Sequence, residues 1–523
     1  MKKSTIFLSV LCLWLGLCSI SVAQSSLTLL SLSAHPDDED GSALAYYGKL
    51  KNVKTYSIFY TRGEGGQNEI GSQLGEELGI LRTKETLGAA VFLGSEVFFL
   101  GFPDFGFSKT AKETFAMWGG KDSVLARLVY AIRVIKPDVI ITNHDTITTK
   151  PNRQHGNHQA VGITAYEAFE KAADPSYHPE QLNGDVAPWQ VKNLFFRFLN
   201  RGNVAQDSLV TLDTKRRDVS GKTIDEIAMH ALSMHRSQGM DKIVLDSVPS
   251  FFRQHKYYMV RSALPYAYDS TDLFSGIIPQ PQKRFSVPAI EFNPVLLHQA
   301  RENSPASVRA KYSKNILIGL VATYDQTIEQ TLRAYNIRYE KLDSATLAKG
   351  KLGTYSTIIL DLRAYEYRHD AVRYNDRLLL YVKNGGNLIC LYHKPGDWNG
   401  KNFAPYPVTL TGERVTEETA PVTMLNPSHR LFNKPNKITN EDWNDWVQER
   451  SIYLPSDDTT KTSPRYERLL AMSDTDEQQP PTSLLYTTFG KGTYMYVSLA
   501  LYRQLRNYNE GAVKLFFNLI SRK

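Results

Sequence analysis

The sequence has little cysteine and, after its N-terminal segment, no long apolar run. It contains three cysteines among 523 residues, and two of them, Cys12 and Cys18, fall within that first segment. If the segment is removed, Cys390 is the only thiol left, so neither an internal disulfide nor a thiolate-based metal site can form. Any metal would therefore be held by histidines and carboxylates. No later stretch has the roughly 18 consecutive apolar residues of a membrane span, so we expect no membrane span.

The N-terminal segment, MKKSTIFLSVLCLWLGLCSISVAQ, has the pattern of a secretory signal peptide. Lys2 and Lys3 precede an apolar run that ends in small residues, Ser21-Val22-Ala23. We therefore assign residues 1–23 to a signal and expect an exported protein, either periplasmic or secreted. A lipoprotein signal through Cys18 is the weaker interpretation, because Leu17 is bulky where a small residue is expected.

The charge is modest and not concentrated. The chain has 61 basic and 54 acidic residues, and its formal net charge of +7 falls to +5 once Lys2 and Lys3 are removed. Since the basic residues are scattered rather than arranged in a stripe, we expect no nucleic-acid partner. Hydrophobic residues make up 42% of the chain and charged residues 22%, as in ordinary globular proteins.

The first half of the mature chain, residues 24–275, alternates strand-like and helix-like segments. Helical patterns separate four short apolar runs, which are Leu27–Ser33, Lys54–Tyr60, Glu96–Leu100 and Asp138–Thr142. The helical patterns are Ser42–Leu50, Glu76–Phe92 and Ser123–Ile135. Such alternation predicts an α/β fold, a Rossmann-like, mostly parallel sheet with helices on both faces. Ligands of such sheets bind at the carboxyl ends of the strands.

A second alternation follows a proline-interrupted segment, residues 276–312, which we interpret as a linker. It occupies residues 313–523, and we expect a second α/β domain there. The expected strands are Ile316–Val321, Thr357–Asp361, Asn387–Tyr392 and Thr493–Ser498, and the expected helices are Gln326–Tyr335, Ala371–Val382 and Gly511–Ile520.

The strongest local signal is Ala34-His35-Pro36-Asp37-Asp38-Glu39, directly after the first predicted strand. Pro36 fixes its own backbone and restrains His35 toward an extended conformation, so the neighbouring side chains leave the strand in a defined order. His35 and Asp38, three residues apart, are suited to bind one ion while Asp37 points to an adjacent position. Taken alone, a histidine before proline is more often structural, and Asp-Asp-Glu also suits a helix N-terminus.

A second cluster, His155-Gly156-Asn157-His158, follows the fourth predicted strand and opens a helix over Gln159–Phe169. Residues three apart share a helix face, so both imidazoles can point into one cleft. The first and fourth strands can be neighbours at the switch point of a doubly wound sheet, which would bring the two clusters together.

Two histidines and one carboxylate with an open fourth position form a known catalytic zinc arrangement. We assign His35, Asp38 and His158 as metal ligands and Asp37 as the base that takes a proton from the activated water. His155 would stabilise the oxyanion or protonate the leaving amine. The expected cofactor is Zn²⁺, with another divalent metal left open.

These residues resemble the PIG-L/LmbE-like family of zinc-dependent N-acetylglucosaminyl deacetylases, over roughly residues 25–275. The resemblance gives His35 and Asp38 as zinc ligands, Asp37 as the base, and the pair His155 and His158 as the second family motif. The family often has an acid inside that second motif, where this chain has Asn157, which leaves that acid's role without a counterpart.

The resemblance also indicates two substrate-binding residues. Arg82, on the predicted helix after the loop Thr61–Gly66, corresponds to a family arginine that reaches the sugar, and Asp104 falls where the family has a sugar-binding acid. The structural alternatives are a salt bridge from Arg82 to Glu85 and a turn-forming role for Asp104. Residues that could line the pocket without binding the metal are His144, Asp145 and His235.

The second domain resembles the class I glutamine amidotransferase-like fold. An active member needs its cysteine on an exposed strand-to-helix elbow, but Cys390 lies inside Asn387–Tyr392 without the small flanking residues of an elbow. We therefore interpret Cys390 as a buried core residue and the domain as non-catalytic. An aromatic group, Trp443, Trp446 and Tyr453, suggests either packing or a sugar-contacting surface.

The residues together favour a zinc-dependent hydrolase that removes the acetyl group from an N-acetylated sugar or glycan. One alternative is a carbohydrate-binding protein that keeps the fold without catalysis, and another is a thiol-dependent amidohydrolase in the second domain. The particular substrate and the oligomeric state are left open by the sequence.

Overall fold

The structure is a computed structural model that describes residues 27–148, 154–199, 205, 208–244, 254–265, 269, 271–279, 292, 304–313, 315–478, 480 and 483–521. The predicted signal at 1–23 lies outside the described residues, and so does most of the predicted linker at 276–312. Within the described part of the chain, no helix has both the length and the apolar character required to cross a membrane.

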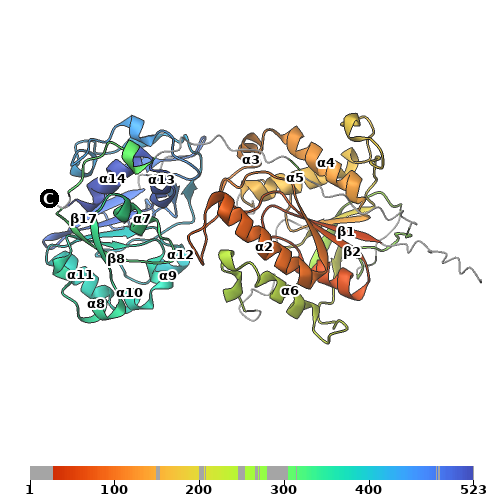
Figure 1. The fold of residues 1–523 in the computed structure, drawn as a ribbon, viewed down its shortest axis with the longest axis horizontal. Coiled ribbons are helices and arrows are strands. Elements are labelled where there is room, and N and C mark those ends of the chain that lie inside the picture. Colours follow the sequence, from red (N-terminus) through yellow and green to blue (C-terminus); the bar gives the residue numbers. More distant parts are fainter. Residues whose placement is uncertain are drawn as a thin grey trace, which may run out of the picture.

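In the described part of the chain, two seven-stranded sheets, each covered by helices on both faces, form two α/β units that lie side by side (Figure 1). The first sheet has the strand order β3-β2-β1-β4-β5-β7-β6. Its strands are β1 (Thr28–Ser33), β2 (Lys54–Phe59), β3 (Ser95–Phe99), β4 (Val139–Thr142), β5 (Asn193–Arg197), β6 (Leu209–Thr211) and β7 (Lys256–Ser262). The four predicted runs are therefore confirmed as strands.

The first five strands of this sheet are parallel, and β7 and β6 add an antiparallel edge. Strand β1 pairs with β2 on one side and with β4 on the other, so the chain reverses its order between β1 and β4. The prediction that the first and fourth strands are neighbours is confirmed. The carboxyl ends of β1 and β4 thus form the crevice in which ligands of such sheets bind.

Helices cover both faces of the first sheet (Figure 1). They are α1 (Gly41–Ala45), which continues as a π-helical turn over Tyr46–Leu50, α2 (Gly75–Leu93), α3 (Ala111–Met117), α4 (Lys121–Ile135), α5 (Gly156–Lys171) and α6 (Ile224–Leu232). Leu29 of β1 packs with α1, α2 and α6, whereas Leu30 and Leu32 pack with α3, α4 and α5. Because strand side chains alternate between faces, a strand buried on both sides is rich in apolar residues on both, and the small polar Ser31 and Ser33 of β1 are buried with them.

The second sheet has the order β15-β17-β18-β11-β10-β8-β9. Its strands are β8 (Leu317–Val321), β9 (Arg338–Lys341), β10 (Thr357–Leu360), β11 (Asn387–Leu391), β15 (Glu467–Arg468), β17 (Leu484–Phe489) and β18 (Gly492–Val497). Two small antiparallel pairs accompany it, β12 (Arg414–Val415) with β14 (Ser451–Ile452), and β13 (Val422–Met424) with β16 (Leu470–Met472).

The helices of the second unit are α7 (Thr327–Ala334), α8 (Ser344–Lys349), α9 (Ala364–Tyr367), α10 (His369–Arg373), α11 (Asn375–Lys383), α12 (Pro395–Trp398), α13 (Leu501–Arg506) and α14 (Glu510–Ile520). The prediction of one helix over Ala371–Val382 was wrong, because the chain breaks at Tyr374 between α10 and α11. The other strands and helices predicted for this half are present, with each end shifted by at most one residue.

Candidate active site

A tight turn at the carboxyl end of β1 positions the side chains of the first cluster, His35, Asp37 and Asp38. The Asp38 amide donates to the His35 carbonyl at 3.2 Å, and the His35 amide donates to Asp38 Oδ2 at 2.9 Å. Between them Asp37 has φ +85, in the left-handed region that few non-glycine residues occupy. Strain of this kind persists only where surrounding contacts hold it. The turn is held by Asn143, whose side chain donates to the Asp38 carbonyl, and by Gln238, whose side chain donates to the Pro36 carbonyl.

Helix α5 supplies the second cluster from the loop after β4. His155 is its N-cap residue and His158 lies in its first turn. A glycine is required at 156, because an added Cβ would lie 2.3 Å from both Ser108 Oγ and the Thr110 carbonyl oxygen. The close approach seats the start of α5 against the loop before α3, so the histidines project from a fixed position.

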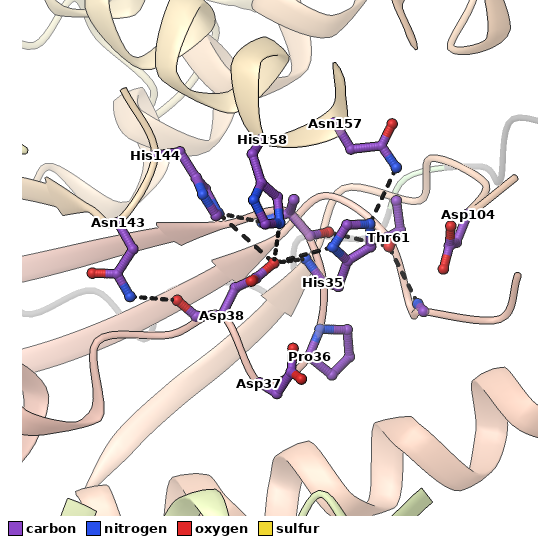
Figure 2. A network of polar contacts seen from close by, with 12 residues as sticks. His35, Pro36, Asp37, Asp38, Thr61, Asp104, Asn143, His144, Asn157 and His158 are labelled. Carbon is purple, nitrogen blue, oxygen red and sulfur yellow. Dashed lines mark hydrogen bonds and ion pairs between the residues drawn. The ribbon is translucent and has the colours of Figure 1, made fainter. Parts of the chain in front are cut away.

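The two clusters meet around one carboxylate oxygen, as Figure 2 shows. Asp38 Oδ2 lies 3.1 Å from His35 Nδ1, 3.2 Å from His158 Nε2 and 3.8 Å from His144 Nε2. The ring centres of His155 and His158 are 3.6 Å apart. The structure therefore brings together all three predicted ligands, with the predicted assistant His155 beside them.

Burial and neighbouring charges shift the pKa values across this cluster. Burial by itself lowers the pKa of the His35 imidazole, but its hydrogen bond to Asp38 and the charge of Asp104 outweigh this and raise that pKa to about 9. Burial, reinforced by the charge of Asp38, raises the pKa of the Asp37 carboxyl to about 7. A carboxylate with a pKa near neutrality is well matched to general-base chemistry.

The pKa values of the other two residues, Asp38 and His155, are lowered. Burial alone would raise the pKa of Asp38, but the charge of His158 and the hydrogen bonds from the histidines hold it well below its usual range. Burial, together with the charge of His158, holds the pKa of His155 well below that of an ordinary histidine. His155 is therefore neutral near pH 7 and able to donate a hydrogen bond through its N–H.

The donor set fits a divalent cation that binds nitrogen and oxygen. Ligand atoms lie within 4.8 Å of one another in two groups that share His158, namely His35, His155 and His158, and Asp38, His144 and His158. His155 Nδ1 is buried with no hydrogen-bond partner among the described residues, so a ring nitrogen remains for an ion or a substrate. Imidazole and carboxylate ligands suit zinc. Which of the overlapping groups binds the ion stays a prediction.

Asn157 holds the His35 ring, a role that the sequence did not indicate. This fully buried residue places Nδ2 3.1 Å from His35 Nε2, while its Oδ1 accepts from the hydroxyls of Thr114 and Ser108 at 2.9 and 3.3 Å. Because an amide nitrogen is a donor only, His35 Nε2 accepts in this contact when the ring is neutral, the form that binds a metal, and Nδ1 is the nitrogen that faces Asp38. An amide thus positions the His35 ring.

Glu39 and His235 form a buried pair that stabilises the turn through the Asp37 amide. His235 Nε2 lies 2.8 Å from Glu39 Oε1, and Glu39 Oε2 accepts from the Asp37 amide at 3.0 Å. Both side chains are buried. His235 thus acts on the site through Glu39, consistent with its predicted place outside the metal set.

His144 is nearer to the cluster than the sequence indicated. Its ring stacks on His158 with centres 4.1 Å apart, and its Nε2 lies 3.2 Å from the Ala34 amide nitrogen, which donates to it. Asp145 is buried and accepts from the Ile147 amide at 2.9 Å. His144 belongs to a candidate metal-binding group and its neighbour Asp145 does not. Because both residue types can bind metals, the difference comes from where the fold places each side chain.

The two predicted substrate-binding residues have structural partners. Arg82 is buried, donates to the carbonyls of Gly63 and Gln67, and contacts Ser237 Oγ at 3.2 Å. The alternative interpretation of Arg82 was a salt bridge to Glu85. In the structure Glu85 accepts instead from the amide and hydroxyl of Ser237. Arg82 still lines the cavity beside Asp37, so a sugar contact stays a prediction.

Asp104 makes the turn contact that the alternative interpretation describes. Its Oδ1 accepts from the Gly106 amide at 2.9 Å, and its own amide donates to Glu64 Oε1. The residue is 5% exposed and lines the same cavity as His35 and Asp37. Its role in sugar binding therefore also stays a prediction.

The cavity over this cluster has a volume of about 390 Å³ and is built by both α/β units. The units meet through Arg503, whose Nη1 donates to the Gly65 carbonyl at 3.0 Å, and through Tyr324, whose hydroxyl donates to Gln67 Oε1 at 3.0 Å. Lys109 adds a buried ion pair with Asp474 at 2.8 Å.

The aromatic group of the second unit separates into two roles. Trp443 and Trp446 are buried in the hydrophobic core, whereas Tyr453 lines the shared cavity. Cys390 lies in β11, fully buried, and burial raises the pKa of its thiol above the ordinary range. A buried and protonated thiol is a poor nucleophile, which argues against the thiol-dependent alternative.

The first comparison is with protein families. Residues 30–169 match the family model described as PIG-L, GlcNAc-PI de-N-acetylase. This segment runs from β1 into α5 and contains both residue clusters, so the predicted resemblance to the PIG-L family is confirmed for it. The predicted resemblance of the second unit to glutamine amidotransferases stays a prediction.

Individual relatives carry deacetylase names. The chain is 27% identical over 218 residues to the 1D-myo-inositol 2-acetamido-2-deoxy-alpha-D-glucopyranoside deacetylase of Geodermatophilus obscurus, a match that covers 38% of this chain and 71% of the relative. It is also 27% identical over 201 residues to the enzyme of that name from Streptomyces avermitilis, covering 35% and 65%. A solved structure of N,N'-diacetylchitobiose deacetylase from Pyrococcus horikoshii matches with 20% identity and a TM-score of 0.32, covering 42% of this chain and 72% of that one.

Proposed function

We propose that the protein is a zinc-dependent N-deacetylase that hydrolyses the acetamide of an N-acetylated, N-acetylglucosamine-like sugar. The observation that carries the proposal is the contact of one Asp38 carboxylate oxygen with ring nitrogens of both His35 and His158, beside Asp37 in one cavity. The match of residues 30–169 to a de-N-acetylase family and the names of the relatives support the class of reaction.

In this proposal His35, Asp38 and His158 hold one divalent ion, which when bound supplies the charge that lowers the pKa of water toward about 7. Asp37 takes a proton from the water as its oxygen adds to the acetyl carbon. The neutral His155 donates a hydrogen bond to the carbonyl oxygen as negative charge develops there. The carbon–nitrogen bond then breaks, the amine nitrogen receives the proton from Asp37, and the products are acetate and an amino sugar.

The replacement of Asp37 by asparagine tests the base. Asp37→Asn keeps the shape of the side chain but removes the proton acceptor, so kcat for acetate release from N-acetylglucosamine oligomers should fall about 100- to 10,000-fold. The zinc content of the purified variant should equal that of the wild type. Asp218→Asn, in a surface loop of the same unit, is the matched control, and undiminished activity in Asp37→Asn would refute the role of the base.

Removal of the metal tests the ligand set. Treatment with a chelator should abolish acetate release, and one equivalent of zinc per chain should restore it. His158→Ala should lose stoichiometric zinc binding, measured by elemental analysis. If zinc-loaded wild type binds acetylated sugars but releases no acetate, the non-catalytic sugar-binding alternative is supported instead.

A further inference from the structure

The second α/β unit contributes a basic wall to the cavity that holds the His–Asp cluster. Its charged lining residues are Arg363, Lys394, Arg414, Arg503 and one acid, Glu449. Among the lining residues of the first unit, four are acids, Asp37, Asp38, Glu69 and Asp104, and one, Arg82, is a permanent cation. The cavity is therefore polarised, with the proposed reaction at its acidic end and cationic side chains facing it.

Part of this positive charge is not neutralised by carboxylates among the described residues. Arg363 is paired with two carboxylates, at 3.1 Å to Glu69 and 2.5 Å to Glu366. In contrast, Arg414 and Arg503 share the single buried carboxylate of Glu449, which is 1% exposed. Two guanidinium groups around one carboxylate leave a net positive charge in the wall.

The Arg414 guanidinium lines the cavity one aromatic ring away from His155. The group lies 4.5 Å from the centre of the Phe107 ring and 4.8 Å from that of Tyr453, and it donates to the Tyr453 hydroxyl at 3.0 Å. Phe107 itself packs against His155, with ring centres 5.2 Å apart, so one ring separates the guanidinium from the proposed oxyanion donor. An arginine has five N–H donors, and the bonds to Glu449 and Tyr453 leave donors for a ligand.

Lys394 extends the basic wall toward solvent. Its side chain is 42% exposed and makes an ion pair with Glu366 at 3.7 Å. Arginine with a fixed planar fork suits carboxylate and phosphate oxygens, and a nearby lysine adds a movable charge.

We propose that this wall, with Arg414 and Lys394 as specificity-determining residues, binds an anionic group of the substrate, a carboxylate or a phosphate, beyond the acetamide. The proposal rests on the proposed function, because it assumes that the acetamide lies at the His–Asp cluster. The favoured substrates are thus acidic N-acetylated sugars, and the second unit selects them.

Calorimetric binding to the zinc-loaded, full-length Asp37→Asn protein tests the proposal without turnover. The probes are an N-acetylglucosamine disaccharide with a hexuronate neighbour, N-acetylglucosamine phosphate, and neutral N,N'-diacetylchitobiose. We expect at least one acidic probe to bind about 10- to 100-fold more tightly than the neutral one. Arg414→Gln should remove this difference while changing the affinity for the neutral probe less than about 3-fold. The acidic probe that binds more tightly identifies the anion as carboxylate or phosphate.

Three further variants keep the test decisive. Lys394→Gln, at an exposed position, should weaken only acidic probes even if Arg414→Gln fails to fold, and Arg414→Lys should keep part of the preference. Lys461→Gln, an exposed lysine of the same unit outside the cavity, should bind as the parent does. Equal affinity for acidic and neutral probes in the parent, or equal losses for both in the variants, would overturn the proposal.

Turnover by the wild type separates the two proposals. Acetate release from acidic and neutral probes with the same kcat/KM would refute the basic wall and leave the deacetylase assignment intact. Selective binding of acidic probes without any acetate release would support the basic wall and refute the deacetylase assignment.

Discussion

Asp37 combines an unusual backbone conformation with a dense set of contacts. Its φ of +85 carries a cost of about 1–3 kcal/mol, which the surrounding structure must offset. The bond from its amide to Glu39 and the bond from Gln238 to Pro36 fix the turn on both sides. The strain thus presents two adjacent carboxylates in different directions, so that Asp38 meets the histidines while Asp37 faces the cavity.

The Asn157 side chain should control metal affinity through His35. Asn157→Ala removes the amide that lies 3.1 Å from His35 Nε2, and loss of such outer contacts typically weakens metal binding about 10- to 100-fold. The readout is the zinc Kd from competition with a chromogenic chelator. Thr164→Val, which removes a buried hydroxyl elsewhere on α5, is the control, and an unchanged Kd in Asn157→Ala would show that the amide does not position the ring.

The roles of individual site residues could be predicted from the sequence where those roles depend on residue type and spacing. His35, Asp38 and His158 could be selected because each stands at the predicted end of a strand or start of a helix. Asn157 and Glu39 could not, because their roles depend on which atoms they meet in the folded protein, here His35 Nε2 and the Asp37 amide. The same limit applied to His144, whose stacking on His158 follows from the register of β4 beside β1.

Elements with strong apolar patterns were predicted well and those with mixed patterns were not. Strands β1 and β4 are buried on both faces, so each is dominated by apolar residues, with small polar residues such as Ser31 and Ser33 buried among them. The antiparallel strand β7, which lies between β5 and the edge strand β6, is mostly half-buried, and its sequence, Lys-Tyr-Tyr-Met-Val-Arg-Ser, begins and ends with polar residues. The break between α10 and α11 at Tyr374 has no proline or glycine to indicate it.

A methyl group at residue 156 should disturb the start of α5. In Gly156→Ala the new Cβ would meet Ser108 Oγ and the Thr110 carbonyl at 2.3 Å, and the carbonyl belongs to the backbone and cannot rotate away. We expect a loss of about 1–3 kcal/mol in the free energy of unfolding, measured by denaturant titration. Gly412→Ala, where nothing lies within 4 Å of the added atom, should be nearly neutral. A similar stability for the two variants would contradict the packing argument.

At the scale of the whole molecule, a buried lysine joins the two units. Lys109 is 8% exposed and pairs with Asp474 of the second unit, which is 5% exposed. In Lys109→Met the Asp474 charge stays buried without its cation, which typically costs about 3–5 kcal/mol. Because the Thr416 amide and hydroxyl also donate to Asp474, we expect the lower end of that range, about 3 kcal/mol.

Thermal unfolding provides the measurement for Lys109→Met. The Tm should fall, and the two units should separate into distinct transitions as their contact weakens. Lys112→Met, one turn further along the same segment at an exposed position, is the control. An unchanged Tm in Lys109→Met would mean that this ion pair contributes nothing to the contact between the units.

The contact between the units should also respond to pH. Burial, aided by the charges of Asp474 and Glu417, raises the pKa of Glu113 from 4.5 to about 7. Because the folded protein binds this proton more tightly than the unfolded chain, the resulting stability is present below pH 4.5 and is lost as the pH rises to about 7. Glu113→Gln should therefore unfold at a higher Tm than wild type at pH 8 and show a smaller difference at pH 5. A constant difference across this range would contradict the shift.

The contribution of the second unit to the lining of the cavity could not be predicted from the sequence. Arg414 lies in a two-residue strand and Arg503 in a short helix, and neither has a neighbouring pattern typical of a binding motif. Their position follows from the contact between two units, each of which has its own sheet. A local pattern identifies the end of one sheet but not which surface of another sheet will lie over it.

The pairing of β1 with β4 also determines when the histidines can come together. The Ala34 amide and His144 Nε2 are 110 residues apart in the chain, and His35 and Asn157 are 122 apart. Contacts of such long sequence separation form only after the entropy of closing a large loop has been overcome, so they appear late in folding. If the proposed site takes up a metal ion, uptake by a refolding chain would therefore report the completion of the first sheet, and a fluorescent metal indicator could follow that step in real time.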